Sequence, residues 1–172
     1  MPQTKALLDQ RSRGAVHIRM ERGGPVVLRE EGSAKCRLPR GSTDAILINT
    51  SGGLAGGDRV DITASAGAHA TLALTTQAAE RVYRTLGPAA EVSVALTAES
   101  NSTLYWLPHE TLLFDGSALA RHLTADVAAD ATFLAVEAMV FGRQAAGEEM
   151  HSVSLRDRWT ILGFTGANDA VA

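Results

Sequence analysis

The stretch GDRVDITASAGAHATLALTT, residues 57–76, is the clearest indication of the fold class, because apolar and polar side chains alternate along it. In its first half, Val60, Ile62 and Ala64 would share one face of a strand, with charged and hydroxyl side chains on the other. A period of two is typical of half-buried β-strands, since successive side chains point to opposite faces. Gly67 interrupts the pattern, so the stretch predicts two short strands joined by a tight turn.

The same alternation recurs on both sides of this stretch, and glycine- or proline-containing turns separate the segments at short intervals. Many short strands with frequent turns predict a mostly β protein built as a sandwich, a barrel or a solenoid. No fixed-period repeat is strong enough to choose among these architectures. The alternating segments lie at residues 16–21, 92–97, 122–127 and 152–161.

Three apolar or mixed segments do not alternate. Residues 45–48 form a short apolar run between turn residues, which favours a buried strand. Residues 133–141 could form a helix or a strand, and residues 77–84 a short helix or a loop turn. We therefore expect at most one or two short helices. Because no linker or low-complexity stretch divides the sequence, we expect a single β-rich domain over residues 1–172.

Composition narrows the class of partner. The net charge is -3 and the pI about 5.9, which argues against nucleic acid because phosphate binding requires a clustered basic excess. Cys36 is the only cysteine, so neither an intrachain disulfide nor a cysteine-built zinc site can form. No apolar run approaches the ~18 residues that span a bilayer. The first 14 residues lack the apolar core of a signal peptide, so we expect a cytoplasmic protein.

The most distinctive string is NTSGGLAGGDR, residues 49–59, in which two glycine pairs permit positive φ or very close backbone approach. It does not fit a phosphate-binding loop, because no Gly-Lys-Ser or Gly-Lys-Thr follows and the glycine spacing differs from the dinucleotide fingerprint. A strand, not a helix, is expected after it.

Two further strings carry candidate carboxylates. In residues 106–116, Pro108 should end a strand and Asp115-Gly116 suits a turn, while Glu110 and Asp115 could bind a cation or simply point to solvent. A zincin motif is excluded there, because the position four residues after the histidine is a leucine. In residues 141–148, glycines flank an arginine, and Glu148 is either its ion partner in a constrained loop or part of an exposed turn.

In this order and spacing, these strings closely resemble UreD-type urease accessory proteins over about residues 14 to 160. The matching segments are GSAKCRLP (32–39), INTSGGLAGGDR (48–59), TTQAAERVYR (75–84), WLPHET (106–111), FDG (114–116) and FGRQAAGE (141–148).

The resemblance implies a mostly β scaffold without chemical turnover of its own. It implies binding to the UreF accessory protein, which engages the UreG GTPase, in an assembly that loads nickel into apo-urease. Nickel would pass transiently, with no tightly bound cofactor, and weak transfer suits scattered oxygen ligands better than a thiolate or imidazole cage. Under this hypothesis the nickel-route candidates are Asp58, Glu110, Asp115 and Glu148.

Family members usually continue well beyond residues 156–161, so we expect the family's C-terminal part to be missing or divergent here. Uncovered strand edges and apolar surface would then favour self-association or dependence on a partner. Two other functions remain open. A small β-fold hydrolase would need paired carboxylates, one with a raised pKa. A ligand-binding module would need an exposed aromatic platform, for which Trp106 and Trp159 are the only tryptophans.

Overall fold

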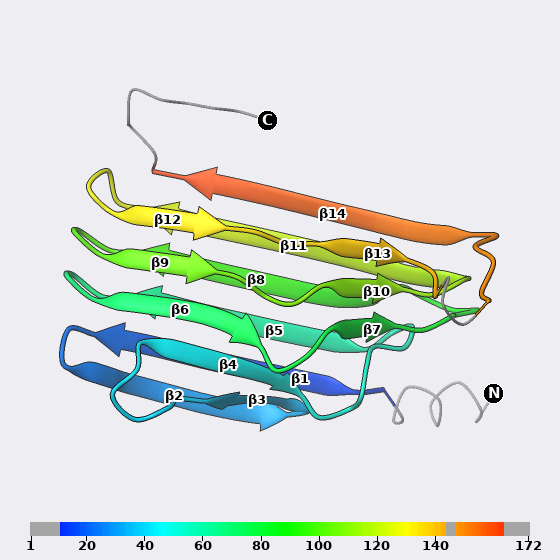
Figure 1. Ribbon diagram of the computed structural model, residues 1–172, viewed down its shortest axis with the longest axis horizontal. Helices are drawn as coiled ribbons and strands as arrows, with labels where there is room; N and C mark the ends of the chain where they lie inside the picture. Colours follow the sequence, from blue (N-terminus) through cyan, green and yellow to red (C-terminus); the bar gives the residue numbers. More distant parts are fainter. Residues whose placement is uncertain (1–10, 144–146, 164–172) are drawn as a thin grey trace, which may run out of the picture.

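The computed structural model describes residues 11–143 and 147–163, and every regular element within these ranges is a β-strand (Figure 1). None of the described segments is a helix that could cross a membrane. The strands are β1 (Arg13–Glu21), β2 (Gly24–Gly32), β3 (Ala34–Arg37), β4 (Asp44–Asn49), β5 (Arg59–Ala66), β6 (Thr71–Thr76), β7 (Glu80–Val82), β8 (Ala90–Ala98), β9 (Thr103–Trp106), β10 (Thr111–Leu113), β11 (Ser117–Val127), β12 (Thr132–Ala135), β13 (Met139–Phe141) and β14 (Val153–Leu162).

The chain winds into stacked coils, and each complete coil gives one strand to each of three sheets (Figure 1). The six-stranded sheet has the order β14-β11-β8-β5-β1-β2, the five-stranded sheet β12-β9-β6-β4-β3, and the three-stranded sheet β13-β10-β7. Equivalent strands of successive coils pair in parallel, as β5 with β8 and β6 with β9. The mostly β prediction is confirmed, and of the three architectures left open the solenoid is the one observed.

The coils are similar but unequal in length. Val60 pairs with Val92 and Val92 with Arg121, while Thr71 pairs with Thr103 and Thr103 with Thr132, so the repeat is roughly 30 residues. Because the turns between strands differ from coil to coil, the repeat is irregular, and this explains why no fixed period is visible in the sequence.

Two local predictions need correction. Residues 77–84 form neither a helix nor only a loop, because β7 lies within them and pairs in parallel with β10. The apolar run 133–141 is not one element, since β12 and β13 occupy its two ends in different sheets. In both cases hydrogen bonding to a neighbouring coil, which is distant in sequence, overrides the local preference. The buried strand expected at 45–48 is confirmed as part of β4.

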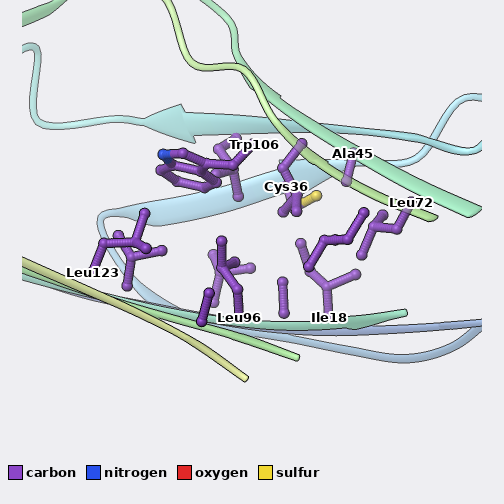
Figure 2. Packing of buried hydrophobic residues seen from close by; sticks show 14 of the residues in the cluster. Ile18, Cys36, Ala45, Leu72, Leu96, Trp106 and Leu123 are labelled. Carbon is purple, nitrogen blue, oxygen red and sulfur yellow. The ribbon is translucent and has the colours of Figure 1, made fainter. Parts of the chain in front are cut away.

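The core lies between the six-stranded and five-stranded sheets. Ile18, Leu96 and Leu123 face it from the first, and Leu72 and Trp106 from the second (Figure 2). These side chains are no more than 3% exposed. The thiol of Cys36 lies among them, and burial raises its pKa to about 11, so it stays protonated at neutral pH. The core therefore holds the coils together, and the polar strings singled out in the sequence lie mostly in the turns between strands.

Candidate functional site

The glycine-rich loop before β5 docks against β7. Leu54 donates its N–H to the Arg81 carbonyl at 2.7 Å, and its own carbonyl accepts the N–H of Tyr83 at 2.8 Å. The Tyr83 hydroxyl donates to the Gly52 carbonyl at 2.9 Å. Gly53 has φ 139°, and a Cβ atom there would overlap the Tyr83 ring. The loop therefore needs glycine at this position, because Tyr83 occupies the space of a side chain.

Aromatic contacts extend from Tyr83 to the next two coils. The rings of Tyr83 and Phe114 lie edge to face, with centroids 5.4 Å apart and an interplanar angle of 72°. The Arg143 guanidinium carbon lies 4.3 Å from the centroid of the Phe114 ring. Both geometries are attractive, since the ring edge and the cation each meet a negatively polarised ring face. Three sequence strings are thus joined through one tyrosine and one phenylalanine.

Asp115 forms the turn after β10 and is held by three donors. Its Oδ1 accepts the backbone N–H groups of His151 at 2.8 Å and Ser152 at 3.0 Å, and its Oδ2 accepts from Arg84 Nη2 at 2.5 Å. The His151 N–H, the Ser152 N–H and the Arg84 guanidinium together lower the pKa of Asp115 to about 2. The carboxylate therefore ties the segment before β14 to the turn.

Glu148 lies next to Asp115 and is held by Arg143. It accepts the Arg143 backbone N–H at 2.8 Å and Nη2 at 3.2 Å, and its Oε1 lies 3.4 Å from the Asp115 N–H. Hydrogen bonding to the Arg143 side chain lowers the pKa of Glu148. We call the set Tyr83, Arg84, Phe114, Asp115, Arg143 and Glu148 the motif junction. Together with Glu149 and His151 it lines an open hollow of about 580 Å³.

Of the four predicted nickel-route residues, the structure brings only Asp115 and Glu148 together. Asp58 is buried elsewhere, where it accepts the N–H groups of Ser12 and Ala55, each at 2.8 Å, and fixes the turn before β5. Glu110 precedes β10, at the opposite end of that strand from Asp115, and its side chain is 44% exposed. Over the described ranges, no three His, Cys, Asp or Glu side chains are grouped to hold a metal ion. Residues 144–146 of the last string lie outside the described residues.

Sequence reasoning missed a buried ionic cluster in the last complete coil. Arg121 points into the core and binds Asp157 through Nε at 3.2 Å and Nη2 at 2.5 Å, and the same Nη2 contacts Glu137. Glu137 also accepts the Trp106 indole N–H at 2.6 Å. Burial raises the pKa of Glu137, opposed by the bonds from Trp106 and Arg121. The alternating pattern could have revealed that Arg121 points inward, because Arg121 and Leu123 lie on the same face of their strand.

Comparison with known proteins connects this arrangement to a family. The sequence model of the UreD urease accessory protein family matches residues 7–166. The chain belongs to this family. A protein of Chelativorans sp. (strain BNC1) named urease accessory protein UreD is 53% identical over 137 residues, which are 78% of this chain and 50% of that protein. One of Rhizobium etli with the same name is 44% identical over 163 residues, 91% of this chain and 60% of that protein.

A third relative, urease accessory protein UreD of Azorhizobium caulinodans, is 48% identical over 137 residues, or 77% of this chain and 50% of that protein. The chain thus spans about half the length of the curated relatives it matches. The strings that meet at the motif junction all lie within the matched region of the UreD family.

Proposed function

We propose that this chain is a cytoplasmic, non-catalytic scaffold in urease maturation, which acts with a UreF-type protein, a UreG-type GTPase and apo-urease. The proposal is supported by UreD family membership. The observation that carries it is the convergence of the family's strings on one surface, the motif junction, although they come from three separate stretches of sequence. Polar residues on loops held by a rigid scaffold are where proteins usually recognise partners.

The chemistry of the motif junction suits recognition better than acid–base catalysis. An acid catalyst needs a pKa near the working pH, whereas the pKa values of Asp115 and Glu148 are both lowered by hydrogen bonding. Glu137 does have a raised pKa, but its side chain is 4% exposed and lies within the core. Trp106 is 3% exposed and offers no platform to a ligand. Nothing specific in the described structure therefore favours the hydrolase or the ligand-binding module.

We further propose that nickel, as cargo, passes through the hollow at the motif junction. The Asp115 N–H lies 3.4 Å from Glu148 Oε1 there, and His151 and Glu149 also line the hollow, although no three of these side chains are grouped as a formed metal site in the described structure. Arg84 and Arg143 already hold the two carboxylates, so a nickel ion would have to displace a guanidinium group. Binding would then be weak and reversible, as a transfer route requires. The route candidates Asp58 and Glu110 would act away from this hollow.

The scaffold role is tested by co-purifying the chain with its cognate UreF-type protein and sizing the product. We expect a stoichiometric complex. A folded chain that forms no complex would refute the scaffold role.

The nickel route is tested separately with the double variant Asp115→Asn/Glu148→Gln in a urease activation assay. We expect reduced activation with the UreF complex retained. Asp61→Asn is the control, because Asp61 is also paired with an arginine but lies on the outer face of β5, away from the motif junction. Unfolding midpoints of all variants confirm that they are folded. Normal activation by the double variant would refute the route through this hollow.

A further inference from the structure

The second glycine pair of the glycine-rich loop, Gly56-Gly57, packs against the loop between β7 and β8. A Cβ atom on Gly56, which is buried, would overlap the Thr85 hydroxyl and the Pro88 carbonyl oxygen. The N–H of Gly57 donates to the Ala89 carbonyl at 3.1 Å. The two loops can approach this closely because Gly56 has no side chain.

The β7–β8 loop is also held from its other side, by the turn that precedes β11. Thr85 donates its N–H to the Gly116 carbonyl at 3.0 Å, and its hydroxyl accepts the N–H of Gly87 at 2.9 Å. Arg84 pairs with Asp115 of the same turn. The loop is therefore fixed between the turns that precede β5 and β11, and its tip has a defined conformation.

Leu86, at the tip of this loop, is the most exposed large apolar side chain of the described residues, with a relative exposure of 103%. A single exposed leucine is common on protein surfaces. Here, however, close glycine packing and several hydrogen bonds order a loop whose leucine adds nothing to the core. Ordering the loop costs conformational entropy that burial of Leu86 does not repay. A side chain presented in one conformation suits binding, because less entropy is then lost on association.

Given the scaffold function proposed for this chain, we propose that Leu86 is the apolar anchor through which it binds the UreF-type protein. Two guanidinium groups flank the anchor. The Arg84 side chain is 66% exposed, and Arg11 Nε would lie 3.3 Å from a Cβ atom on Gly57. Interfaces are complementary in charge as well as in shape. The partner must therefore offer an apolar pocket with carboxylates at its rim.

Two hollows flank the β7–β8 loop and make it a ridge. Tyr83 and Arg84 line the hollow of the motif junction, whereas Thr85 and Gly87 line a second hollow of about 370 Å³. Every residue that lines the second hollow is uncharged, so a partner that covers Leu86 from this side buries no unpaired charge of the chain. An apolar centre with charged groups beside it is the usual anatomy of a protein interface.

The test is the affinity of the cognate UreF-type protein for wild type and variants, measured by titration calorimetry. Leu86→Ser should weaken binding by at least about tenfold, as expected for an anchor residue, and leave the unfolding midpoint unchanged. Val26→Ser is the matched control. Val26 is 60% exposed and follows Pro25, which pairs with Met20 at the opposite end of the strands from the β7–β8 loop. Its replacement should leave the affinity unchanged.

A second pair of variants tests the presentation of the anchor. The methyl group of Gly56→Ala must displace Thr85 and Pro88, so the tip should move and binding should weaken although Leu86 is retained. Gly87→Ala is the control within the same loop, since the nearest atom to its Cβ would be 3.8 Å away. We expect it to bind as wild type does.

The outcomes separate the anchor from the scaffold role. A folded wild-type chain that does not bind the UreF-type protein refutes the scaffold role and the anchor with it. If wild type binds and Leu86→Ser binds equally well, the anchor alone is overturned. Leu86→Ser could also keep the UreF-type protein but lose binding to apo-urease. That result would overturn the assignment of the anchor to the UreF-type protein.

Discussion

Replacing Arg121 by methionine tests the buried ionic cluster most directly. The guanidinium is the shared partner of two carboxylates, and the side chains of Arg121, Glu137 and Asp157 are 7%, 4% and 21% exposed. Removing one partner of a buried pair usually costs about 3–5 kcal/mol, because a charge is left without compensation. The partial exposure of Asp157 places the expected loss near the lower value, about 3 kcal/mol at neutral pH. That is a large share of the roughly 5–15 kcal/mol by which domains are stable.

The loss should depend on pH, with a sign set by Glu137. Because the pKa of Glu137 is raised, the folded chain holds this proton more tightly than the unfolded chain. The group therefore favours folding at low pH and opposes it increasingly as pH rises through its folded pKa. Without Arg121 the folded pKa rises further, so the destabilisation by Arg121→Met should be greatest at neutral pH and smaller near pH 5.

Urea denaturation of wild type and variant at both pH values measures this difference. Arg59→Met is the control, since Arg59 also pairs with two carboxylates of the six-stranded sheet, Asp61 and Glu91, but on its exposed outer face. We expect no resolvable change there, as for most surface ion pairs. Adding Glu137→Gln to Arg121→Met should recover part of the lost stability. The reasoning fails if Arg121→Met costs no more than Arg59→Met, or if its cost grows as the pH falls.

Three further predictions concern single positions. Gly53→Ala should lower the free energy of unfolding by more than about 2 kcal/mol, because it combines backbone strain at positive φ with overlap of the Tyr83 ring. Gly52→Ala, at φ 78° with open space around it, should cost only about 1 kcal/mol. Equal losses for the two variants in urea denaturation would contradict this prediction. Asp115→Asn should lower the unfolding midpoint above pH 4, and the difference from wild type should vanish towards pH 2. The reason is that the pKa of Asp115 is about 2, so its stabilisation of the fold is lost as the pH falls through that range. A difference that does not depend on pH would refute this prediction. Cys36 should react with a thiol reagent only on unfolding, and rapid labelling of the native chain would show that its burial and raised pKa are wrong.

Alternation of apolar and polar residues was enough to predict the class of fold and which side chains face inward. Val16, Ile18 and Met20 alternate as predicted and are buried, because period-two patterning reflects which face of a strand meets the core. Pro108 follows the end of β9, and Asp115-Gly116 forms the expected turn, with Gly116 at φ 72°. The family resemblance also came from sequence alone, since it depends on the order of short strings.

The way in which these strands are combined depends on contacts between coils. The solenoid arises from parallel pairing between coils roughly 30 residues apart, and such non-local hydrogen bonds leave little trace in local sequence. Strands as short as β7 show no period, and their existence depends on a neighbour's free edge.

The candidate site likewise combines features that the sequence predicts with features that depend on tertiary contacts. Sequence supplied Asp115 and Glu148 as separate candidates, but their contact, and the separation of Asp58 and Glu110 from them, depend on how coils of unequal length align their turns. Arg121 has an inward position by parity, yet nothing local shows that Glu137 and Asp157 lie beside it. Patterning fixes which way each side chain points, because that is a property of a single strand. The neighbours it meets depend on the stacking of coils, which only long-range pairing defines.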